Sequence, residues 1–464
     1  MTTTTSSTTT DPIIDAWAAQ RADLYLVIGR GADQLRDALQ RAGASDRPRV
    51  VLAVHPDQDP LTAAQAACEV ASSPGFLPQR VCCAVHPDEI AASDDGGARI
   101  HELAEAAGAG VQRYIVSAST FALHARRFVH HTLRNVAWYP GSTDSASLAN
   151  LAVGLPAIIV AAGPSLADSL HDLRRVRHHA LIIACDTAAP ALLAAGIEPH
   201  AIASIDLQPH KQSALRSLIG RTDALLAQQQ YCHPRISNAW RGPRTWFGTP
   251  SPAAGLLPAV PTVAETLSVA HAAFELGRHL GCSPLVLCGL DLSFTNGTQT
   301  HAPGCVGHWG ERSAARAEVM ATGLDSAPLP TLVSMQAMAT SFEALIAQLP
   351  GDAQVWNATA RGLMIRGARR ASLDAVLDLG ISHDRIPRVG ELRGRELTFD
   401  IDAQLKRLDD AALDPPAALV RMAAFRELLA TRRISEAGER DARAFVRRAC
   451  AKAARALGRS SCTV

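Results

Sequence analysis

Polar residues follow three short apolar runs between residues 156 and 206. The run 157–160 leads into Gly163-Pro164-Ser165, the run 180–184 is followed by Asp186 and Thr187, and the run 201–205 by Asp206. Ligands of open parallel sheets bind at the carboxyl ends of the strands, so we expect these side chains to face one crevice. A glycine turn with a hydroxyl at a helix start suits a phosphate, because the first amides of a helix attract anions.

Two later segments add candidates for the same edge. Asp291 follows the apolar run 284–288, and ten residues later comes His301, whose near-neutral pKa suits a general base for a hydroxyl proton. We therefore assign Asp291 and His301 as catalytic, with His308 as the second choice for the base. Asn357 and Thr359 follow the run 354–356 and are assigned to nucleotide or sugar binding, with Gly163, Pro164, Ser165, Asp186, Thr187 and Asp206.

Each of these residues also has a simpler interpretation. Ser165 could cap a helix without contacting a ligand, since Asp168 follows three residues later. An aspartate at a strand end is often only a turn former. The aspartates at the strand ends could bind ribose hydroxyls, orient a histidine or hold a divalent cation; they are Asp186, Asp206 and Asp291. Arg361 could bind a sugar carboxylate or phosphate, or lie solvated at the surface. The group His301, Cys305 and His308 is an incomplete ligand set for zinc.

The elements that position these residues alternate between strand and helix. Leu166, Leu170 and Leu173 recur at helical spacing, residues 188–195 form a short helix that stops at Gly196, and residues 262–280 form another. A further apolar stripe at helical spacing covers residues 333–349. The alternation predicts an α/β fold with a Rossmann-like central parallel sheet.

The N-terminal region has a similar beginning. Residues 24–28 read as a strand, Gly29-Arg30-Gly31 as a turn, residues 32–42 as a helix and residues 50–54 as a strand. The third glycine of a dinucleotide fingerprint is missing, and Asp57 is only loosely placed for a ribose contact. The interpretation we favour is a Rossmann-like accessory domain without a cofactor.

These patterns divide the chain into five parts. We expect a disordered tail over 1–10, an N-terminal Rossmann-like domain over 11–111, a helical connector over 112–150, a central domain over 151–373 and a helical C-terminal region over 374–464. The stretch HARRFVHHTLRN belongs to the connector, and the basic C-terminal end reads as a solvated helix face.

The composition is that of a globular protein of 464 residues with a net charge of +1. This balance gives no electrostatic reason to expect nucleic acid as a partner. The ten cysteines form no C-x-x-C pair, and we find neither a secretion signal nor an apolar run of membrane length. We therefore expect a cytoplasmic protein with reduced thiols and no membrane insertion.

Four motifs in order resemble the motility-associated factor (Maf) flagellin glycosyltransferases, which share their central domain with 6-hydroxymethylpterin diphosphokinase MptE-like proteins. The motifs are IIVAAGPSL, CDTAAPALLAAGIEPHAIASIDLQP, VAHAAFELGRHLGCSPLVLCGLDLSFTNGTQTHA and VWNATARGLMIRG. The resemblance implies a sialyltransferase-like fold and a CMP-nonulosonate donor of the pseudaminic or legionaminic type. It also implies a Ser or Thr hydroxyl of flagellin as acceptor, with Gly163, Pro164 and Ser165 holding the cytidine phosphate. Two positions depart from the family pattern, at Leu290 and at Ala360-Arg361-Gly362.

Two other functions remain open. A pterin diphosphokinase using ATP and magnesium would explain the aspartates as metal ligands and the glycine turn as a phosphate cradle. Against it, the chain has no G-x-x-x-x-G-K-[ST] loop and is much longer than one kinase domain requires. A non-catalytic binding protein that keeps the sheet is the third possibility.

Overall fold

The computed structural model describes residues 11–20, 22–41, 49–71, 81–93, 95, 97–208, 215–248, 256–257, 260–261, 267–294, 299–305, 317–351, 353–379, 385–425, 427 and 434–460. The chain forms two compact units, Met1–Ser119 and Thr120–Val464. The predicted disordered tail lies outside the described residues. The long helix α5, Ala98–Asn135, runs through the predicted limit at residue 111, and the domain limits expected from the sequence stay predictions.

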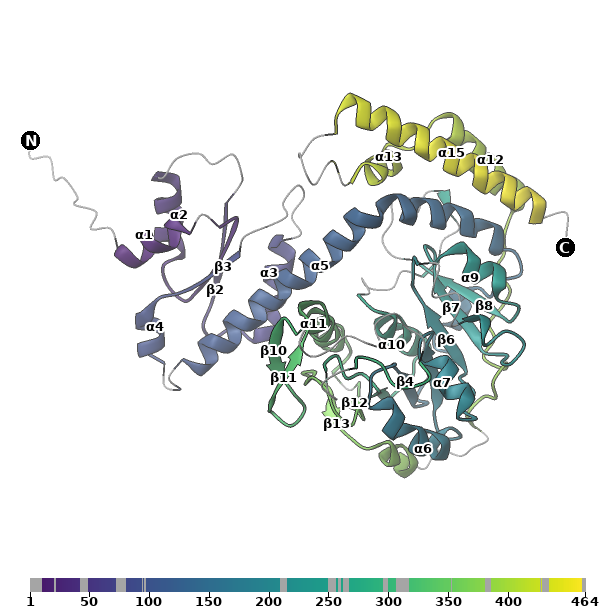
Figure 1. Ribbon diagram of the computed structural model, residues 1–464, viewed down its shortest axis with the longest axis horizontal. Helices are drawn as coiled ribbons and strands as arrows, with labels where there is room; N and C mark the ends of the chain where they lie inside the picture. The colour runs from purple at the N-terminus through teal and green to yellow at the C-terminus, as the bar shows by residue number, and fades with distance from the viewer. Residues whose placement is uncertain are drawn as a thin grey trace, which may run out of the picture. The chain divides into compact units, whose positions relative to one another are not determined.

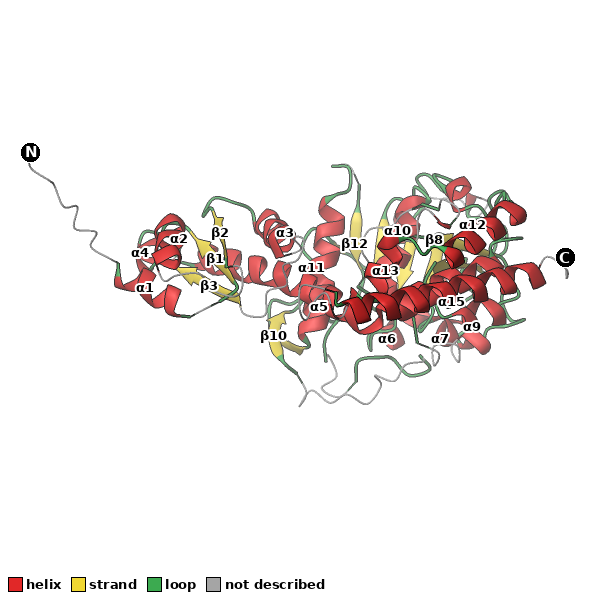
Figure 2. Ribbon diagram, turned by 90° about the horizontal axis from the view of Figure 1, so that it is seen from above, coloured by secondary structure: helices red, strands yellow, loops and turns green. Residues whose placement is uncertain are grey.

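The N-terminal unit contains a three-stranded parallel sheet in the order β2-β1-β3. Its strands are β1 (Leu24–Ile28), β2 (Val50–Val54) and β3 (Val81–Val85), and its helices before α5 are α1 (Pro12–Ala19), α2 (Ala32–Arg41), α3 (Pro60–Ala71) and α4 (Pro87–Ala91). Alternate residues of β1 pack into two different hydrophobic clusters, because successive side chains of a strand point to opposite faces. Figure 2 shows α1 and α2 on one side of the strands and α3 on the other.

The second unit is built on an eight-stranded sheet in the order β13-β12-β9-β4-β5-β6-β7-β8, and every neighbouring pair is parallel. The strands are β4 (Ala157–Val160), β5 (Leu181–Cys185), β6 (Ala201–Ser204), β7 (Leu225–Gln229), β8 (Arg244–Phe247), β9 (Leu285–Cys288), β12 (Val355–Asn357) and β13 (Arg369–Arg370). The inner strands are buried along their whole length, as in sheets covered on both faces. The predicted α/β class is confirmed.

Other described elements of this unit are helices, 3-10 turns and a hairpin. They are α6 (Leu166–Val176), α7 (Ala189–Ala194), α9 (Pro234–Ala239), α10 (Val269–His279), α11 (Val333–Ala347), the 3-10 turns η1 (Val136–Trp138), η2 (Ser145–Leu148) and η6 (Leu373–Leu379), and the antiparallel pair β10 (Val319–Thr322) and β11 (Pro328–Thr331). Gly277 brings α10 close to the sheet, because a Cβ there would lie 2.8 Å from Leu285 Cδ2 and 3.4 Å from Ile159 Cδ1.

The predicted helical C-terminal region consists of α12 (Ile401–Leu413), α13 (Ala417–Ala423) and α15 (Glu436–Ser460). Figure 1 shows α12 and α13 lying along α15. Their apolar sides share a hydrophobic cluster with the last turns of α5, which contributes Val129 and Leu133. In the described part of the chain, no helix is both long and apolar enough to cross a membrane.

His200 links the segment around Pro387 to the sheet. The Nδ1 atom of this buried side chain accepts a hydrogen bond from Ile182 N at 2.9 Å, and Nε2 lies 2.9 Å from Pro387 O. This arrangement requires a neutral ring with the proton on Nε2, since Nδ1 accepts. Burial is the main reason that the pKa of His200 falls to about 4 from the ordinary value of 6.5.

We expect His200 to make the second unit less stable in mild acid. Between pH 6.5 and about 4 the unfolded chain binds a proton at this residue and the folded chain does not, so the free energy of unfolding falls as the pH falls. His200→Gln is expected to reduce the slope of stability against pH in this window, and His171→Gln, an exposed control on α6, is expected to keep it. Urea unfolding at several pH values measures both slopes, and equal slopes for parent and His200→Gln would contradict the assignment.

Candidate functional site

The strand order of the large sheet reverses between β4 and β9. From β4 the chain proceeds through β5, β6, β7 and β8 on one side, and then returns to β9 on the other side of β4, with β12 and β13 beyond. In open α/β sheets the ligand crevice lies at such a reversal, outside the carboxyl ends of the strands. The turn after β4 and the loop after β9 both leave the sheet at this point, so we take it as the candidate site.

Asp291 and Ser165 meet at this reversal, although 126 residues separate them. The Asp291 carboxylate accepts a hydrogen bond from Ser165 Oγ at 2.6 Å and from Ser165 N at 3.1 Å. Both residues are buried, since Ser165 is 0% exposed and Asp291 is 1% exposed. Gly163 makes the approach possible, because a Cβ at this position would lie 2.3 Å from Asp291 Oδ1 and 2.5 Å from Gly289 O.

The contacts of this turn correct two interpretations of its residues. Ser165 occupies the N-cap position of α6, but its side chain makes no capping hydrogen bond. The amides do not point at a vacant anion site either, because Ser165 N donates to Asp291, Leu166 N to Gly163 O at 3.0 Å and Ala167 N to Pro164 O at 3.3 Å. The physical reason is that the protein supplies its own carboxylate at the start of the helix, where a negative charge is favoured. Nucleotide contacts by Gly163, Pro164 and Ser165 stay predictions.

The ends of β5 and β6 hold the next two aspartates. Asp186 is fully buried, and its Oδ2 accepts a hydrogen bond from Ser204 Oγ at 2.7 Å; Thr187 beside it is 6% exposed. Asp206 is only partly buried and its Oδ1 accepts from Gln208 N at 2.7 Å, which is the geometry of a turn-forming aspartate.

The aspartates do not fit a shared cation site. Among the described residues, no group of three or more His, Cys, Asp or Glu side chains is arranged to bind a metal ion. Asp291 accepts a hydrogen bond from Ser165, Asp186 from Ser204 and Asp206 from Gln208 in its own turn, so these bonds hold the three carboxylates at different strand ends.

Asn357 and Thr359 form a turn at the end of β12, and Thr359 bonds to the loop after β9. Asn357 Oδ1 accepts from Thr359 N at 3.0 Å, and Thr359 Oγ1 accepts from Leu290 N at 3.1 Å. Asn357 Nδ2 is buried and has no hydrogen-bond partner within the described ranges. Arg361, which is about half exposed, forms an ion pair with Asp168 in the first turn of α6. The Asn357 amide nitrogen is thus a buried donor at this edge of the sheet.

His301 lies beside the turn that follows β4. Ala302 N donates to Ala162 O at 2.8 Å, which places the histidine one residue from a contact with the start of that turn. The ring is partly exposed, and its Nδ1 lies 3.0 Å from Thr300 Oγ1. The structure thus brings His301 to the same strand ends as Gly163 and Asp291. His308, the second choice for the base and the last member of the incomplete zinc set, lies outside the described residues.

The α5 residues His124, Arg127 and His131 lie near the segment that follows β6. These residues were not assigned to a site from the sequence. Arg127 Nη1 donates to Gln208 Oε1 at 3.2 Å, and the rings of His131 and His233 lie 4.8 Å apart. Burial, followed by the neighbouring histidines, lowers the pKa of His131 to about 3, so this ring is neutral at physiological pH. The signal was the spacing of His124, Arg127 and His131, which places them on one face of a helix.

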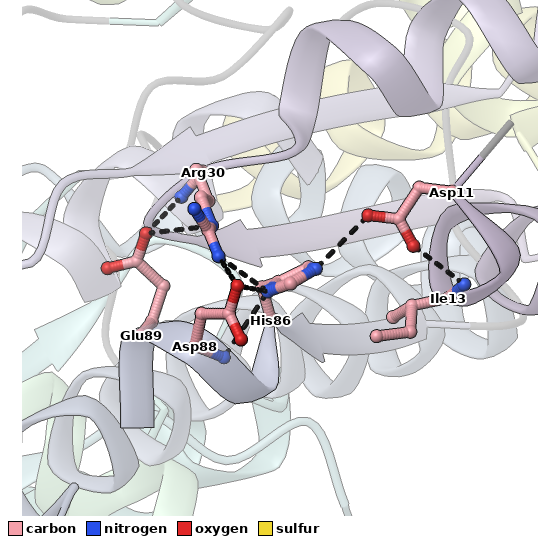
Figure 3. Close-up of polar contacts among 6 residues, drawn as sticks. All are labelled: Asp11, Ile13, Arg30, His86, Asp88 and Glu89. Carbon is pink, nitrogen blue, oxygen red and sulfur yellow. Dashed lines mark hydrogen bonds and ion pairs between the residues drawn. The ribbon is translucent and has the colours of Figure 1, made fainter. Parts of the chain in front are cut away.

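The Glu89 side chain of α4 occupies the glycine turn of the N-terminal unit (Figure 3). Arg30 N donates to Glu89 Oε1 at 3.0 Å, and the Arg30 guanidinium contacts Asp88 and lies 3.2 Å from His86 Nδ1. A Cβ at Gly29 would lie 2.5 Å from Glu89 Cδ. A nucleotide phosphate would need the space and the amide that Glu89 uses, so the arrangement favours an accessory unit.

Comparisons with known proteins bear on the central region. The family model described as 6-hydroxymethylpterin diphosphokinase MptE-like matches residues 130–297. A solved structure, the MAf glycosyltransferase from Magnetospirillum magneticum AMB-1, is similar over 97% of this chain and 78% of that chain, at 16% sequence identity and a TM-score of 0.49. No curated protein matches the sequence significantly. The family-model match confirms the MptE-like part of the resemblance drawn from the motifs, over residues 130–297.

Proposed function

We propose that this chain is a cytoplasmic glycosyltransferase that moves a nonulosonic acid of the pseudaminic or legionaminic type from a CMP-sugar to a Ser or Thr hydroxyl of flagellin. The observation that carries the proposal is the junction of β4 and β9. Three of the four motifs that suggest the family meet there, because Ser165 donates to Asp291 and the neighbouring Leu290 donates to Thr359. Such a reversal point is where α/β proteins bind ligands.

The positions of the residues at this junction suggest different roles for them. Ser165 and Asp291 are buried and bonded to each other, so we assign them first to holding the turn in place. The nucleotide contact of Ser165 and the catalytic role of Asp291 stay predictions. Thr187, Asn357 and the backbone of Gly163 and Pro164 stand at the strand ends, where the donor would lie.

The transfer step needs a base for the acceptor hydroxyl. His301 would take the hydroxyl proton while the oxygen forms its bond to the anomeric carbon of the sugar. The bond between that carbon and the phosphate oxygen breaks, and its electron pair leaves with CMP. The partly exposed position of His301 suits this role, because a protein acceptor must reach it from solvent.

The intact mass of flagellin tests the proposal. Deleting the gene in its host is expected to lower the mass of flagellin by whole sugar units, and a plasmid copy of the gene should restore the mass. Mass spectrometry of flagellin from parent, deletion and complemented strains gives the answer. Identical masses in all three strains would refute flagellin as the acceptor.

The second candidate is a diphosphokinase acting on a pterin, and the match of residues 130–297 to the MptE-like family model favours it. Its test is to incubate the full chain with ATP, magnesium and 6-hydroxymethylpterin and to measure AMP. AMP formation that depends on the pterin, with no change in flagellin mass on deletion, would replace the first proposal.

A further inference from the structure

A cavity of about 470 Å³ opens where four segments of the second unit meet. These are the last turn of α5, the turn η1, the helix α9 and the C-terminal half of α15. The side chains that matter for its chemistry are Arg134, Trp138, Arg235, Asn238, Lys452 and Arg455. The cavity lies against α9, which follows β7, and β7 is three strands away from β4 in the sheet. It is therefore separate from the junction of β4 and β9.

The lining carries four positive charges and no acidic residue. Within the described residues, Arg134, Arg235, Lys452 and Arg455 form no ion pair. Other arginines of the same helices are paired: Arg126 of α5 with Asp441, and Arg443 of α15 with Glu439. Four like charges around one recess repel each other, and an anion bound between them would relieve this repulsion.

The positive field extends beyond the lining. Behind Trp138, the Arg244 guanidinium lies 5.3 Å from the centre of the indole ring, and burial lowers the pKa of Arg244 to about 10, which keeps it charged at neutral pH. Arg244 donates to Ser237 O and Trp240 O, both at 2.8 Å, so carbonyls solvate its charge, and no carboxylate in the described ranges forms an ion pair with it. Burial, then Arg134 and Lys452, lower the pKa of His130.

We propose that this cavity binds a small molecule that carries two or more phosphate groups. Arginine forks bind phosphate oxygens in pairs, and three arginines with a lysine match a ligand with several such oxygens. The Asn238 amide and the Trp138 ring offer contacts to an organic part of the ligand. The volume lies within the range of small-molecule sites, and a recess of this kind suits a discrete molecule better than a flat bilayer surface.

Arg134 contacts the backbone of α15 at the wall of the cavity. Its Nη1 lies 3.5 Å from Lys452 O, which links α5 to α15 at the wall of the cavity. Because this contact uses the backbone of Lys452, changing the lysine side chain leaves it intact. Lys452 and Arg455 are both exposed, so substitutions there remove charge without disturbing the core.

Calorimetry with inorganic triphosphate tests the proposal on the full chain at 0.15 M salt. Lys452→Gln/Arg455→Gln is expected to weaken triphosphate binding about tenfold or more, because two charge-assisted contacts are lost. Arg447→Gln/Arg448→Gln is the charge-matched control, since both arginines are exposed on α15 outside the cavity; a loss of less than about threefold is expected there, from the screened field alone.

Other results would overturn the assignment. If both double variants bind triphosphate with equally reduced affinity, the effect comes from net charge and not from the cavity. If the parent does not bind triphosphate, the proposed site does not exist. Sedimentation of the parent with phosphatidylglycerol vesicles, without triphosphate binding, would show a membrane contact instead. The binding measurement does not involve sugar transfer, so a negative result does not affect the proposed glycosyltransferase function. Likewise, an unchanged flagellin mass does not affect the proposed phosphate site.

Discussion

Substitution of His301 by alanine is expected to lower the rate of sugar transfer about a hundredfold or more, while the affinity for the CMP-sugar stays close to that of the parent. Loss of a general base removes a contribution of this size from the transition state and little from donor binding. The motivation is the position of the ring beside the turn that follows β4, next to the hydrogen bond between Ala302 N and Ala162 O.

The measurement is transfer to purified flagellin, followed by intact mass, with donor affinity from calorimetry. His171→Ala is the matched control, because His171 is an exposed histidine on α6. Its turnover is expected to equal that of the parent. If His301→Ala keeps near-normal turnover, the base is another group, and His308 is the next residue to replace. If donor affinity falls together with turnover, His301 binds the donor rather than acting as the base.

Replacing Gly163 with alanine is expected to destabilise the second unit by about 3 kcal/mol, near the upper end of overpacking costs in buried sites. The added Cβ would lie 2.5 Å from Gly289 O and 2.3 Å from Asp291 Oδ1. Gly289 O is a backbone atom that already accepts a hydrogen bond from Gly163 N at 2.8 Å, so it cannot move aside cheaply. The Ser165–Asp291 contact would have to open as well.

Gly351 offers the control for this prediction, because a Cβ there would meet no atom within 4 Å. Gly351→Ala is expected to change the free energy of unfolding by less than about 0.5 kcal/mol, as for other surface changes. Denaturant unfolding of the parent and both variants provides the comparison. A Gly163→Ala protein as stable as Gly351→Ala would show that the turn is less tightly held than the described contacts indicate.

Local sequence patterns determined the elements around the candidate site. The strands at 157–160, 180–184, 201–205 and 284–288 were placed within one residue of β4, β5, β6 and β9, because apolar runs between turn residues are the direct signature of buried strands. The strands β7 and β8 were not predicted. Gln228 and Gln229 are buried in β7, and polar residues inside a sheet give no apolar run to recognise.

The contacts between distant segments came only from the tertiary structure. The sequence placed Ser165 and Asp291 at strand ends, but their hydrogen bond depends on β9 lying next to β4, and strand order is not written in local periodicity. In the same way, Lys452 and Arg455 read as a solvated helix face, since nothing near them in the chain indicates Arg134 or Arg235. Burial and helical or strand spacing are local properties of a sequence, whereas charge clusters and shared turns arise when segments hundreds of residues apart pack together.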